Sequence, residues 1–450
     1  MLLDLPHHIL IEILSRLPSE SVCCIRCVSK ALLKTVDDLS FVALHTRLLI
    51  ATNAVSQVPQ LMSFAAPFPS ESSAVIADLQ PVKFNGSALT TRRKYAINVS
   101  TSRLLDNPTY MIDFVFLNLL CFRNKNDRGL GVCFLVDPLR GEVLRLPRND
   151  IIKDAKSPVF CDWYGMGFDS ITNTLKILRV TKVNAADCMV AQVLVLGKSS
   201  WRQIPSTPPC YLSGIRSLFS PKNACAYGVM HWLRAAHVMG KGDEVISPII
   251  SFDFKKEEFC WTPHPSPRLQ SSKEYSGLYV HLHLLTLRGS LALVDTSLSQ
   301  GMTTNIEIWM LKDYDKKEWT LNYSLNIEMF DLRKEFGRLW EVTCGEWEHG
   351  IYFKSFEKTP AFLLDLRCGS MNPITCGSGN RTKILSYTGS LICLKDYDTG
   401  VEAEQSIESL KSYVNLMEEA EGFSISGRHM MRGVSVIQEG NSDTAHKALV

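Results

Sequence analysis

The sequence predicts an α+β protein of more than one domain: a small N-terminal module of three helices followed by a mostly antiparallel β-propeller of five to seven blades. Two observations carry this fold class. Apolar residues in the first 48 positions recur at the spacing of one helix face. From about residue 115 onward, short strands separated by turn residues recur with a period of about 60 residues.

The first helix is predicted between Pro6 and Pro18. Pro6 suits a first helical turn, because its missing N–H needs no partner there, and Pro18 ends the run. The apolar residues between them follow at steps of three, four and five, which places them on one face. They are Leu5, Ile9, Leu10, Ile13, Leu14 and Leu17.

Two further helices are predicted, one from Ser19, expected as its N-cap, and one from Ser40. Their apolar residues at helical spacing are Val22, Ile25, Val28 and Leu32 in the former, and Phe41, Leu44 and Leu48 in the latter. Three helices in fewer than 50 residues bury little of their surface. We therefore expect the apolar face to continue into a partner.

This N-terminal stretch resembles an F-box of the kind found in large plant F-box families. The matching strings are Leu5-Pro6, Ile9-Leu10, Glu12 to Pro18, Arg26 to Lys30 and Ser40 to His45. One departure is Leu32, where such families usually have tryptophan. The resemblance implies docking onto the Skp-type adaptor of a cullin-based SCF ubiquitin ligase.

The resemblance also implies which residues contact that adaptor: Leu5, Pro6, Ile9, Leu10, Ile13, Leu14, Leu17, Pro18, Val22, Ile25, Val28, Ser29 and Lys30. The first eight would form the main apolar contact, and the others would add the second helix. A small bundle must use some of them for its own core, so for each residue an internal packing role stays open.

The repeat region contains two half-motifs that keep one period. In the first, an apolar strand and a polar turn precede a large residue that begins the return strand. These returning residues are Val143, Trp201, Phe259, Trp319 and Met371, at intervals of 58, 58, 60 and 52. In the second, a glycine precedes a strand, at Gly228, Gly289 and Gly350, each 61 residues apart. Such units suit propeller blades, whereas a β-sandwich would not require a repeat.

After an F-box, residues of about 115 to 394 resemble the F-box-associated interaction domain of plant F-box proteins, which is similar to kelch propellers. The strings that carry this likeness include Val136 to Glu142, Tyr164 to Ser170, Ser200 to Ile204 and Ile306 to Trp309. The usual Asn-Gly start of the first unit is here Asn118-Leu119, so we expect that turn to be remodelled.

The predicted domains are the F-box over 1–48, a connector or first blade over 49–110, the propeller over 111–394 and a tail over 395–450. The tail is expected to be solvated because it is polar, with one short amphipathic helix between Ile407 and Met417.

Composition argues against several classes of protein. The formal net charge is +2 and no dense run of Lys or Arg occurs, so we expect neither nucleic-acid nor membrane binding. The longest apolar stretch, Phe114 to Phe122, is too short to span a bilayer, and no secretory signal is recognised. We expect an intracellular protein, cytoplasmic or nuclear, whose fourteen cysteines are free thiols.

No catalytic or metal-binding motif is recognised, so we expect no cofactor and no metal. Cys24 and Cys27 form a CxxC within a predicted helix, without a second pair of ligands. His281 and His283 share a strand face but lack a third ligand, and His231 is expected to pack or hydrogen-bond. Gly165-Met166-Gly167 is interpreted as a turn.

These features predict a non-catalytic substrate receptor that binds an unidentified target protein through inter-strand loops on one propeller face. Trp201, Trp309 and Trp319 are expected to pack the sheets rather than bind a ligand. Two alternatives stay open, because fold does not decide function: a propeller-based enzyme or sugar-binding protein, and an F-box scaffold that does not direct degradation.

Overall fold

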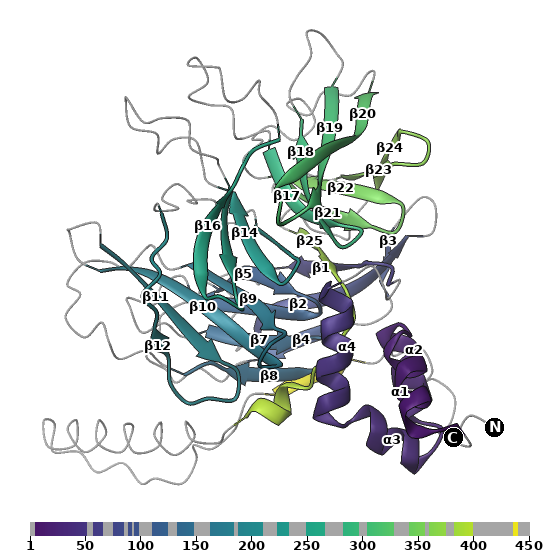
Figure 1. Ribbon diagram of the computed structural model, residues 1–450. Helices are drawn as coiled ribbons and strands as arrows, with labels where there is room; N and C mark the ends of the chain where they lie inside the picture. Colours follow the sequence, from purple (N-terminus) through teal and green to yellow (C-terminus); the bar gives the residue numbers. More distant parts are fainter. Residues whose placement is uncertain are drawn as a thin grey trace, which may run out of the picture.

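The structure is a computed structural model that describes residues 5–51, 57–65, 75–84, 89–91, 94–98, 110–124, 133–147, 163–183, 188–209, 223–233, 249–265, 282–296, 304–327, 342–355, 360–374, 382–398 and 435–439. A helical N-terminal module is followed by a mostly antiparallel β-propeller, which confirms the predicted fold class (Figure 1).

Residues 5–51 form four helices rather than the predicted three: α1 (His7–Ser15), α2 (Ser19–Arg26), α3 (Lys30–Val36) and α4 (Leu39–Ala51). The segment predicted as one helix from Ser19 to Leu32 is interrupted before α3. Ser29 has extended backbone angles, φ −154° and ψ 157°, and its hydroxyl accepts a hydrogen bond from Leu32 N at 3.2 Å. Ser29 is thus the N-cap that begins α3.

The start of α2 also differs from the prediction. Pro18, with φ −55° and ψ 144°, occupies the N-cap position without a side-chain hydrogen bond, and Ser19 is the first helical residue. The Ser19 hydroxyl is therefore available for a partner outside the helix. That partner lies in the C-terminal part of the chain and is described below.

The four helices share a small apolar core. It contains Leu10, Leu14, Val22, Leu32, Val36, Phe41 and Val42, together with Leu391 from the far end of the chain. Leu32, which stands where tryptophan is usual, is buried there. His45 of α4 is also buried, and its Nε2 lies 2.9 Å from the carbonyl oxygen of Leu17. This contact ties α4 to the residues that follow α1.

Five four-stranded antiparallel sheets follow in chain order. The first holds β5 (Tyr110–Phe116), β6 (Leu119–Asn124), β7 (Cys133–Asp137) and β8 (Glu142–Arg145). The second holds β9 (Trp163–Asp169), β10 (Thr174–Val183), β11 (Cys188–Val195) and β12 (Arg202–Gln203). The third holds β13 (Asn223–Ala226), β14 (Val229–Leu233), β15 (Ile249–Asp253) and β16 (Glu258–Thr262).

The fourth sheet holds β17 (Leu282–Leu287), β18 (Ser290–Asp295), β19 (Thr304–Asp313) and β20 (Glu318–Ile327), and the fifth holds β21 (Val342–Trp347), β22 (Gly350–Ser355), β23 (Ala361–Asp365) and β24 (Ser370–Ile374). Both predicted half-motifs map onto equivalent places in these sheets. The returning residues lie in, or directly before, the fourth strand of each sheet. The three repeated glycines precede or begin the second strand.

A sixth sheet closes the ring with strands from both ends of the domain. Its order is β25 (Thr382–Tyr387), β1 (Gln60–Ala65), β2 (Val75–Phe84), β4 (Lys94–Asn98) and β26 (Ser435–Glu439), with β3 (Leu89–Thr91) paired to β2. Because β25 contacts both β21 and β5, this sheet lies between the fifth and the first.

The sixth sheet clarifies the two segments outside the repeats. The stretch assigned to a connector or first blade supplies β1 to β4 of this sheet. The tail, which was expected to be solvated, contributes β26, whose Ser435 pairs with Asn98. The helix predicted between Ile407 and Met417 lies outside the described residues.

The two glycines interpreted as a turn lie inside β9, so that prediction is wrong. A Cβ on Gly165 would lie 2.5 Å from the Trp232 ring, and one on Gly167 would lie 2.1 Å from the Phe254 ring. The missing side chains let these two buried aromatic residues of the third sheet pack closely against β9. The glycines serve packing between sheets, where a strand glycine marks a close approach.

Aspartates shape several of the tight hairpins. The side chains of Asp137, Asp169, Asp253 and Asp365 each accept a hydrogen bond from the backbone N–H two residues later, at 2.8 to 2.9 Å. Aspartate favours such local bonds in turns. These hairpins join the first to the second strand or the third to the fourth strand, so in antiparallel sheets they lie on one common face of the ring. We call it the hairpin face.

Candidate functional site

The helical module carries a concentration of exposed apolar side chains. Nine large apolar side chains are exposed in the part of the chain that the structure describes, and five of them lie in residues 5–51: Ile9, Ile13, Val28, Leu33 and Leu39. Val28 is 73% exposed. Single exposed apolar residues are ordinary on protein surfaces, whereas several in so small a module indicate an interaction surface.

The structure divides the thirteen residues of the predicted adaptor contact into three groups. Those buried in the helical core are Leu10, Leu14 and Val22. Those that are half-buried are Leu5, Leu17, Pro18, Ile25 and Ser29. Those that are exposed are Pro6, Ile9, Ile13, Val28 and Lys30.

Two exposed apolar residues were missed by sequence reasoning. Leu33 directly follows a buried position of α3, and Leu39 is the first residue of α4. Neither belongs to the regular apolar spacing that pointed to the other residues. The sequence signal that could have identified them is an apolar residue that lies beside the buried helix face and not on it.

On α1 the exposed and the buried apolar residues alternate as neighbouring pairs. Ile9 and Ile13 are one helical turn apart and therefore adjacent on the surface. Leu10 and Leu14, the next residue in each case, are buried in the core. Adjacent residues of α1 thus belong to two different faces, one that packs in the helical core and one that is accessible to a partner.

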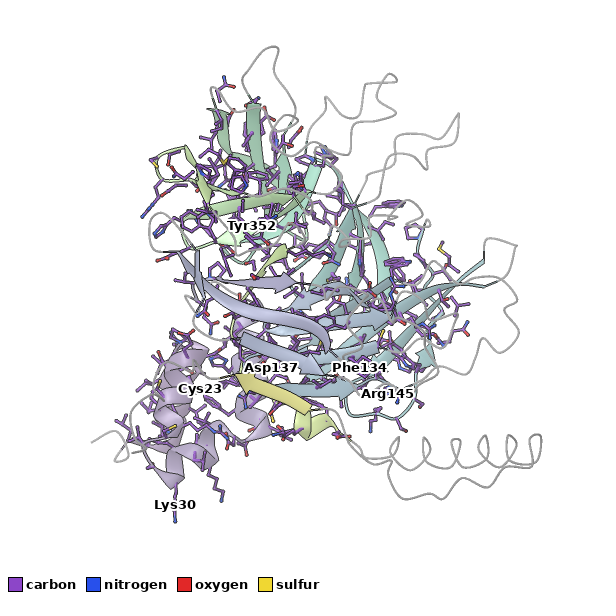
Figure 2. All side chains as sticks on the ribbon, turned by 180° about the vertical axis from the view of Figure 1, so that it is seen from behind. Cys23, Lys30, Phe134, Asp137, Arg145 and Tyr352 are labelled. Atoms are coloured by element: carbon purple, nitrogen blue, oxygen red, sulfur yellow. The ribbon has the colours of Figure 1, made fainter. Side chains whose placement is uncertain are left out.

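The corner between α2 and α3 is braced by an ion pair. Arg26 Nη2 donates to Asp37 Oδ2 at 2.8 Å, which links the end of α2 to the residue after α3. This hydrogen bond raises the pKa of the Arg26 guanidinium above its usual range. The exposed Val28 and Lys30 lie at the same corner, and Figure 2 shows Lys30 at the end of the module farthest from the propeller.

A short C-terminal segment fastens the helical module to the propeller. We call residues Thr388–Leu394 the strap. At its start, Thr388 N donates to Leu117 O of the first hairpin at 3.2 Å. The Ser19 hydroxyl, which does not cap α2, donates to Gly389 O at 2.9 Å. Two consecutive strap residues, Thr388 and Gly389, therefore form hydrogen bonds to the first sheet and to the helices.

Apolar strap residues enter the cores on both sides. Leu391 is buried among the helices, while Ile392 and Leu394 are buried in the core of the first sheets. Ala43 and Ile50 of α4 pack against this same propeller core. The module is thus joined to the propeller by a strap whose side chains pack on both domains and by α4. Figure 1 shows α4 beside the propeller strands.

Polar groups of the first sheet hold the strap backbone in place. Arg140 Nη2 donates to Leu391 O at 3.2 Å, and Glu142 Oε2 accepts a bond from Leu394 N at 2.7 Å. The Ser390 hydroxyl bonds to the buried Asn118 side chain. Leu117, with φ 55°, and Asn118 form the turn between β5 and β6, and both residues contact the strap.

The helical module lies against part of the hairpin face, whereas hairpin residues such as Ile171 and Lys316 are exposed. Leu117 belongs to the first hairpin, and Ile50 lies 4.0 Å from the position of a Cβ on Gly228 in the hairpin of the third sheet. Because the strands are antiparallel, connections between second and third strands, and between successive sheets, start from the opposite face.

Three predictions about isolated residues can be compared with the structure. His231 is buried, its Nδ1 lies 2.7 Å from Ser251 Oγ, and burial lowers its pKa to about 3, which confirms a packing and hydrogen-bonding role. Of the histidine pair, His283 is buried and His281 lies outside the described residues. Cys24 and Cys27 are exposed free thiols.

Two of the repeated tryptophans bridge neighbouring sheets. Trp201 Nε1 donates to Pro147 O at 2.8 Å, and Trp319 Nε1 donates to Pro263 O at 2.9 Å. In each case a residue at the fourth strand of one sheet bonds to the segment that follows the fourth strand of the preceding sheet. This repeated contact agrees with the structural role predicted for these residues.

Within the described ranges, no group of three or more His, Cys, Asp or Glu side chains is arranged to hold a metal ion. Over the same ranges, no helix combines the length and the apolar character needed to cross a membrane.

A helical module with an exposed apolar surface, fastened to a closed β-propeller, defines a two-domain interaction protein. The family comparisons agree. Residues 2–44 match the F-box domain and residues 75–358 match the F-box associated beta propeller domain. The chain therefore belongs to the family of F-box proteins that carry an F-box-associated β-propeller.

Individual proteins show the same relationship at low identity. The chain is 26% identical over 326 residues to F-box protein At5g65850 of Arabidopsis thaliana, which covers 70% of each protein. It is 25% identical over 340 residues to F-box protein At1g47340 of Arabidopsis thaliana, which covers 73% of this chain and 65% of that protein. Among solved structures, apo AztD from Citrobacter koseri matches 74% of this chain and 100% of that chain at 8% identity with a TM-score of 0.33, which is too low to carry an argument.

Proposed function

We propose that this protein is the substrate-recognition subunit of an SCF-type E3 ubiquitin ligase. Its F-box docks onto a Skp-type adaptor, which connects it to a cullin, and its propeller binds a target protein for ubiquitination. Membership of the F-box family with an associated propeller supports this function. The observation that carries it is the gathering of exposed apolar side chains on the helical module.

The accessible part of the docking surface consists of Pro6, Ile9, Ile13, Val28 and Lys30, with Leu33 and Leu39 as additions. The half-buried residues Leu5, Leu17, Pro18, Ile25 and Ser29 complete its margin. Leu10, Leu14 and Val22 act indirectly, since they hold the helices that present the accessible side chains.

The subunit contributes proximity rather than covalent chemistry. Holding a target beside the conjugating enzyme raises the effective concentration of its lysines. Because the helical module lies against part of the hairpin face, we expect target recognition by the connections on the opposite face, where loops vary without disturbing the sheets. Such a ligase works inside the cell, in the cytoplasm or the nucleus.

Adaptor docking is tested by titrating a purified Skp-type adaptor with the full-length protein and with the double variant Ile9→Ser/Ile13→Ser. Both isoleucines are 39% exposed, so their replacement should leave the thermal unfolding curve nearly unchanged. We expect the affinity to fall at least about tenfold, which corresponds to about 1.4 kcal/mol. Leu321→Ser is the matched control, because Leu321 is 44% exposed on β20, outside the helical module.

Binding of the double variant at wild-type affinity, or failure of the wild-type protein to bind the adaptor, would overturn the proposal. The same double variant also serves as a target trap in cells, because it retains the propeller, the strap and the folded helices. A target should accumulate when the proteasome is blocked in cells with the wild-type protein. A partner that binds but never accumulates would identify a non-degradative scaffold instead.

A further inference from the structure

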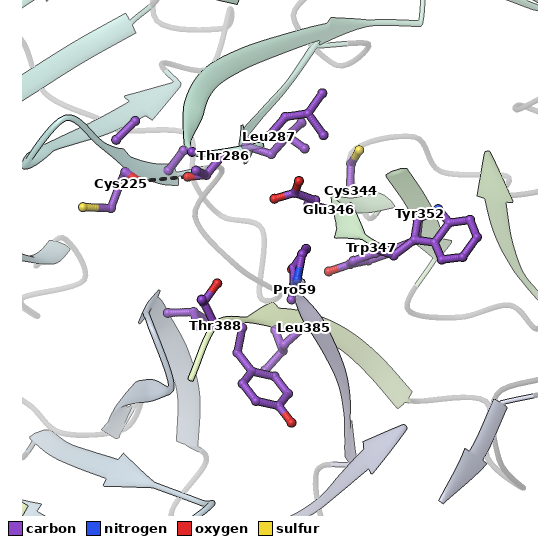
Figure 3. Close-up of a pocket in the computed structure, with 18 of the residues that line it drawn as sticks. Pro59, Cys225, Thr286, Leu287, Cys344, Glu346, Trp347, Tyr352, Leu385 and Thr388 are labelled. Carbon is purple, nitrogen blue, oxygen red and sulfur yellow. Dashed lines mark hydrogen bonds between the residues drawn. The ribbon is translucent and has the colours of Figure 1, made fainter. Parts of the chain in front are cut away.

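A cavity of about 650 Å³ lies along the axis of the propeller (Figure 3). Its wall is built from the first strands of four sheets, β5, β13, β17 and β21, and from β25, the edge strand of the sixth sheet. Leu49 and Ile50 of α4 and residues 57–59, which precede β1, also line it. The volume lies within the range of small-molecule sites in proteins.

Aliphatic side chains that are only partly buried form the apolar part of the cavity wall. They include Leu49, Ile50, Pro59, Val115 and Leu117, together with the exposed Val58. A wall of this kind suits the apolar body of an organic molecule.

Several polar groups of the wall are bonded to backbone carbonyls. The Thr286 hydroxyl donates to Cys225 O at 2.9 Å, as Figure 3 shows, and the Tyr352 hydroxyl donates to Ile384 O at 2.9 Å. The Trp347 Nε1 group donates to Leu364 O at 3.3 Å. These donors are therefore occupied by the fold itself.

Glu346 differs from these groups. Its Oε1 accepts one hydrogen bond, from Arg288 N at 2.7 Å, and among the described residues it forms no ion pair. The Arg288 guanidinium lies instead over the Tyr323 ring, 6.0 Å from its centroid. Burial raises the pKa of the Glu346 carboxyl to about 7. Arg288 also lines the cavity, but its charge lowers this pKa only in part. The carboxylate therefore stays costly in these surroundings, and a bound cation would offset that cost.

We propose that the axial cavity binds a small organic cation, an ammonium or guanidinium group on an apolar body, with the Glu346 carboxylate as its counter-charge. The chemical class follows from the two properties of the wall. The aliphatic side chains select the body, and the half-buried Glu346 carboxylate selects the charge. This inference does not depend on adaptor docking.

The test uses the full-length protein and two probes of similar size and opposite charge, 2-phenylethylamine and 3-phenylpropionate. Binding is followed by calorimetry and by the shift of the thermal unfolding midpoint. We expect the amine to bind saturably and the carboxylate probe not to bind. Glu346→Gln keeps the shape of the side chain and removes its charge, so we expect it to weaken amine binding at least about tenfold.

Glu348→Gln is the matched control, because Glu348 also lines the cavity, two residues away, but is exposed to solvent. We expect this variant to bind the amine as the wild-type protein does. Equal binding of both probes to the wild-type protein, no amine binding up to about 10 mM, or equal amine binding by wild type and Glu346→Gln would overturn the proposal. The comparison of the two probes on the wild-type protein needs no variant.

Discussion

The hydroxyl of Ser19 donates a hydrogen bond to the carbonyl oxygen of Gly389 at 2.9 Å, across 370 positions of the chain. The side-chain amide of Gln57 lies within 2.7 Å of the same hydroxyl. The first residue of α2, the connector and the strap therefore meet at one point. A residue type that ordinarily caps a helix here joins the F-box to the propeller.

The strap should contribute to the stability of the helical module. Leu391→Ala removes a side chain from the helical core, and Leu-to-Ala changes in cores cost about 2 to 5 kcal/mol. We expect earlier thermal unfolding of the helices and faster proteolysis within residues 5–51. Leu139→Ala is the control, since Leu139 is 38% exposed in the turn between β7 and β8. Wild-type unfolding and proteolysis of Leu391→Ala would contradict the packing role.

Two neighbouring residues of α1 should separate stability from docking. Leu14→Ala empties a fully buried position and should cost about 2 to 5 kcal/mol of unfolding free energy. Ile13→Ala, at a 39% exposed position, should change that free energy by less than about 1 kcal/mol and should weaken adaptor binding. Urea unfolding and adaptor titration of both variants check this division. A reversed pattern would mean that the accessible face has been misassigned.

A methyl group on β9 should disturb the packing between the second and third sheets. Gly167→Ala places a Cβ 2.1 Å from the Phe254 ring, and such overpacking costs about 1 to 3 kcal/mol. Gly389→Ala is the comparison, because its Cβ would meet nothing closer than Ser19 Cβ at 3.6 Å. We expect the unfolding midpoint to fall clearly for the former and to change little for the latter.

Stability should depend on pH through Glu346. Burial raises the pKa of the folded-state carboxyl to about 7 from its ordinary 4.5. A raised pKa means that the folded state favours the protonated carboxyl. The stability that Glu346 contributes to the wild-type protein is therefore fully present below pH 4.5 and is lost as the pH rises toward 7. Relative to wild type, Glu346→Gln should gain stability over this window, by up to about 3 kcal/mol. Unfolding free energies that run parallel from pH 4.5 to 8 would contradict this, and Glu348→Gln serves as the exposed control.

Local patterns in the sequence sufficed to predict much of the architecture. The apolar spacing between Pro6 and Pro18 predicted α1, and the strand and turn repeat predicted the blades and the role of Trp201 and Trp319. The division of the second predicted helix was also accessible locally, because Ser29 is a favoured N-cap residue. The helical spacing of the apolar residues continues across Ser29, so spacing alone predicted one uninterrupted helix.

Contacts between distant parts of the chain could not be predicted in this way. The apolar face of the F-box was expected to be completed by another protein, yet Leu391 of the same chain covers part of it. Gly165 and Gly167 suggested a turn because their aromatic neighbours lie in another sheet. The cavity around Glu346 exists only once five sheets surround it, so no single stretch of sequence shows it.

The position of Leu391 imposes an order on biosynthesis. The ribosome releases the helices first, but their hydrophobic centre lacks this leucine until nearly the whole propeller has been translated. A prematurely terminated polypeptide would thus emerge with unfinished helices. The four helices would therefore reach their full stability only in chains whose propeller has been translated.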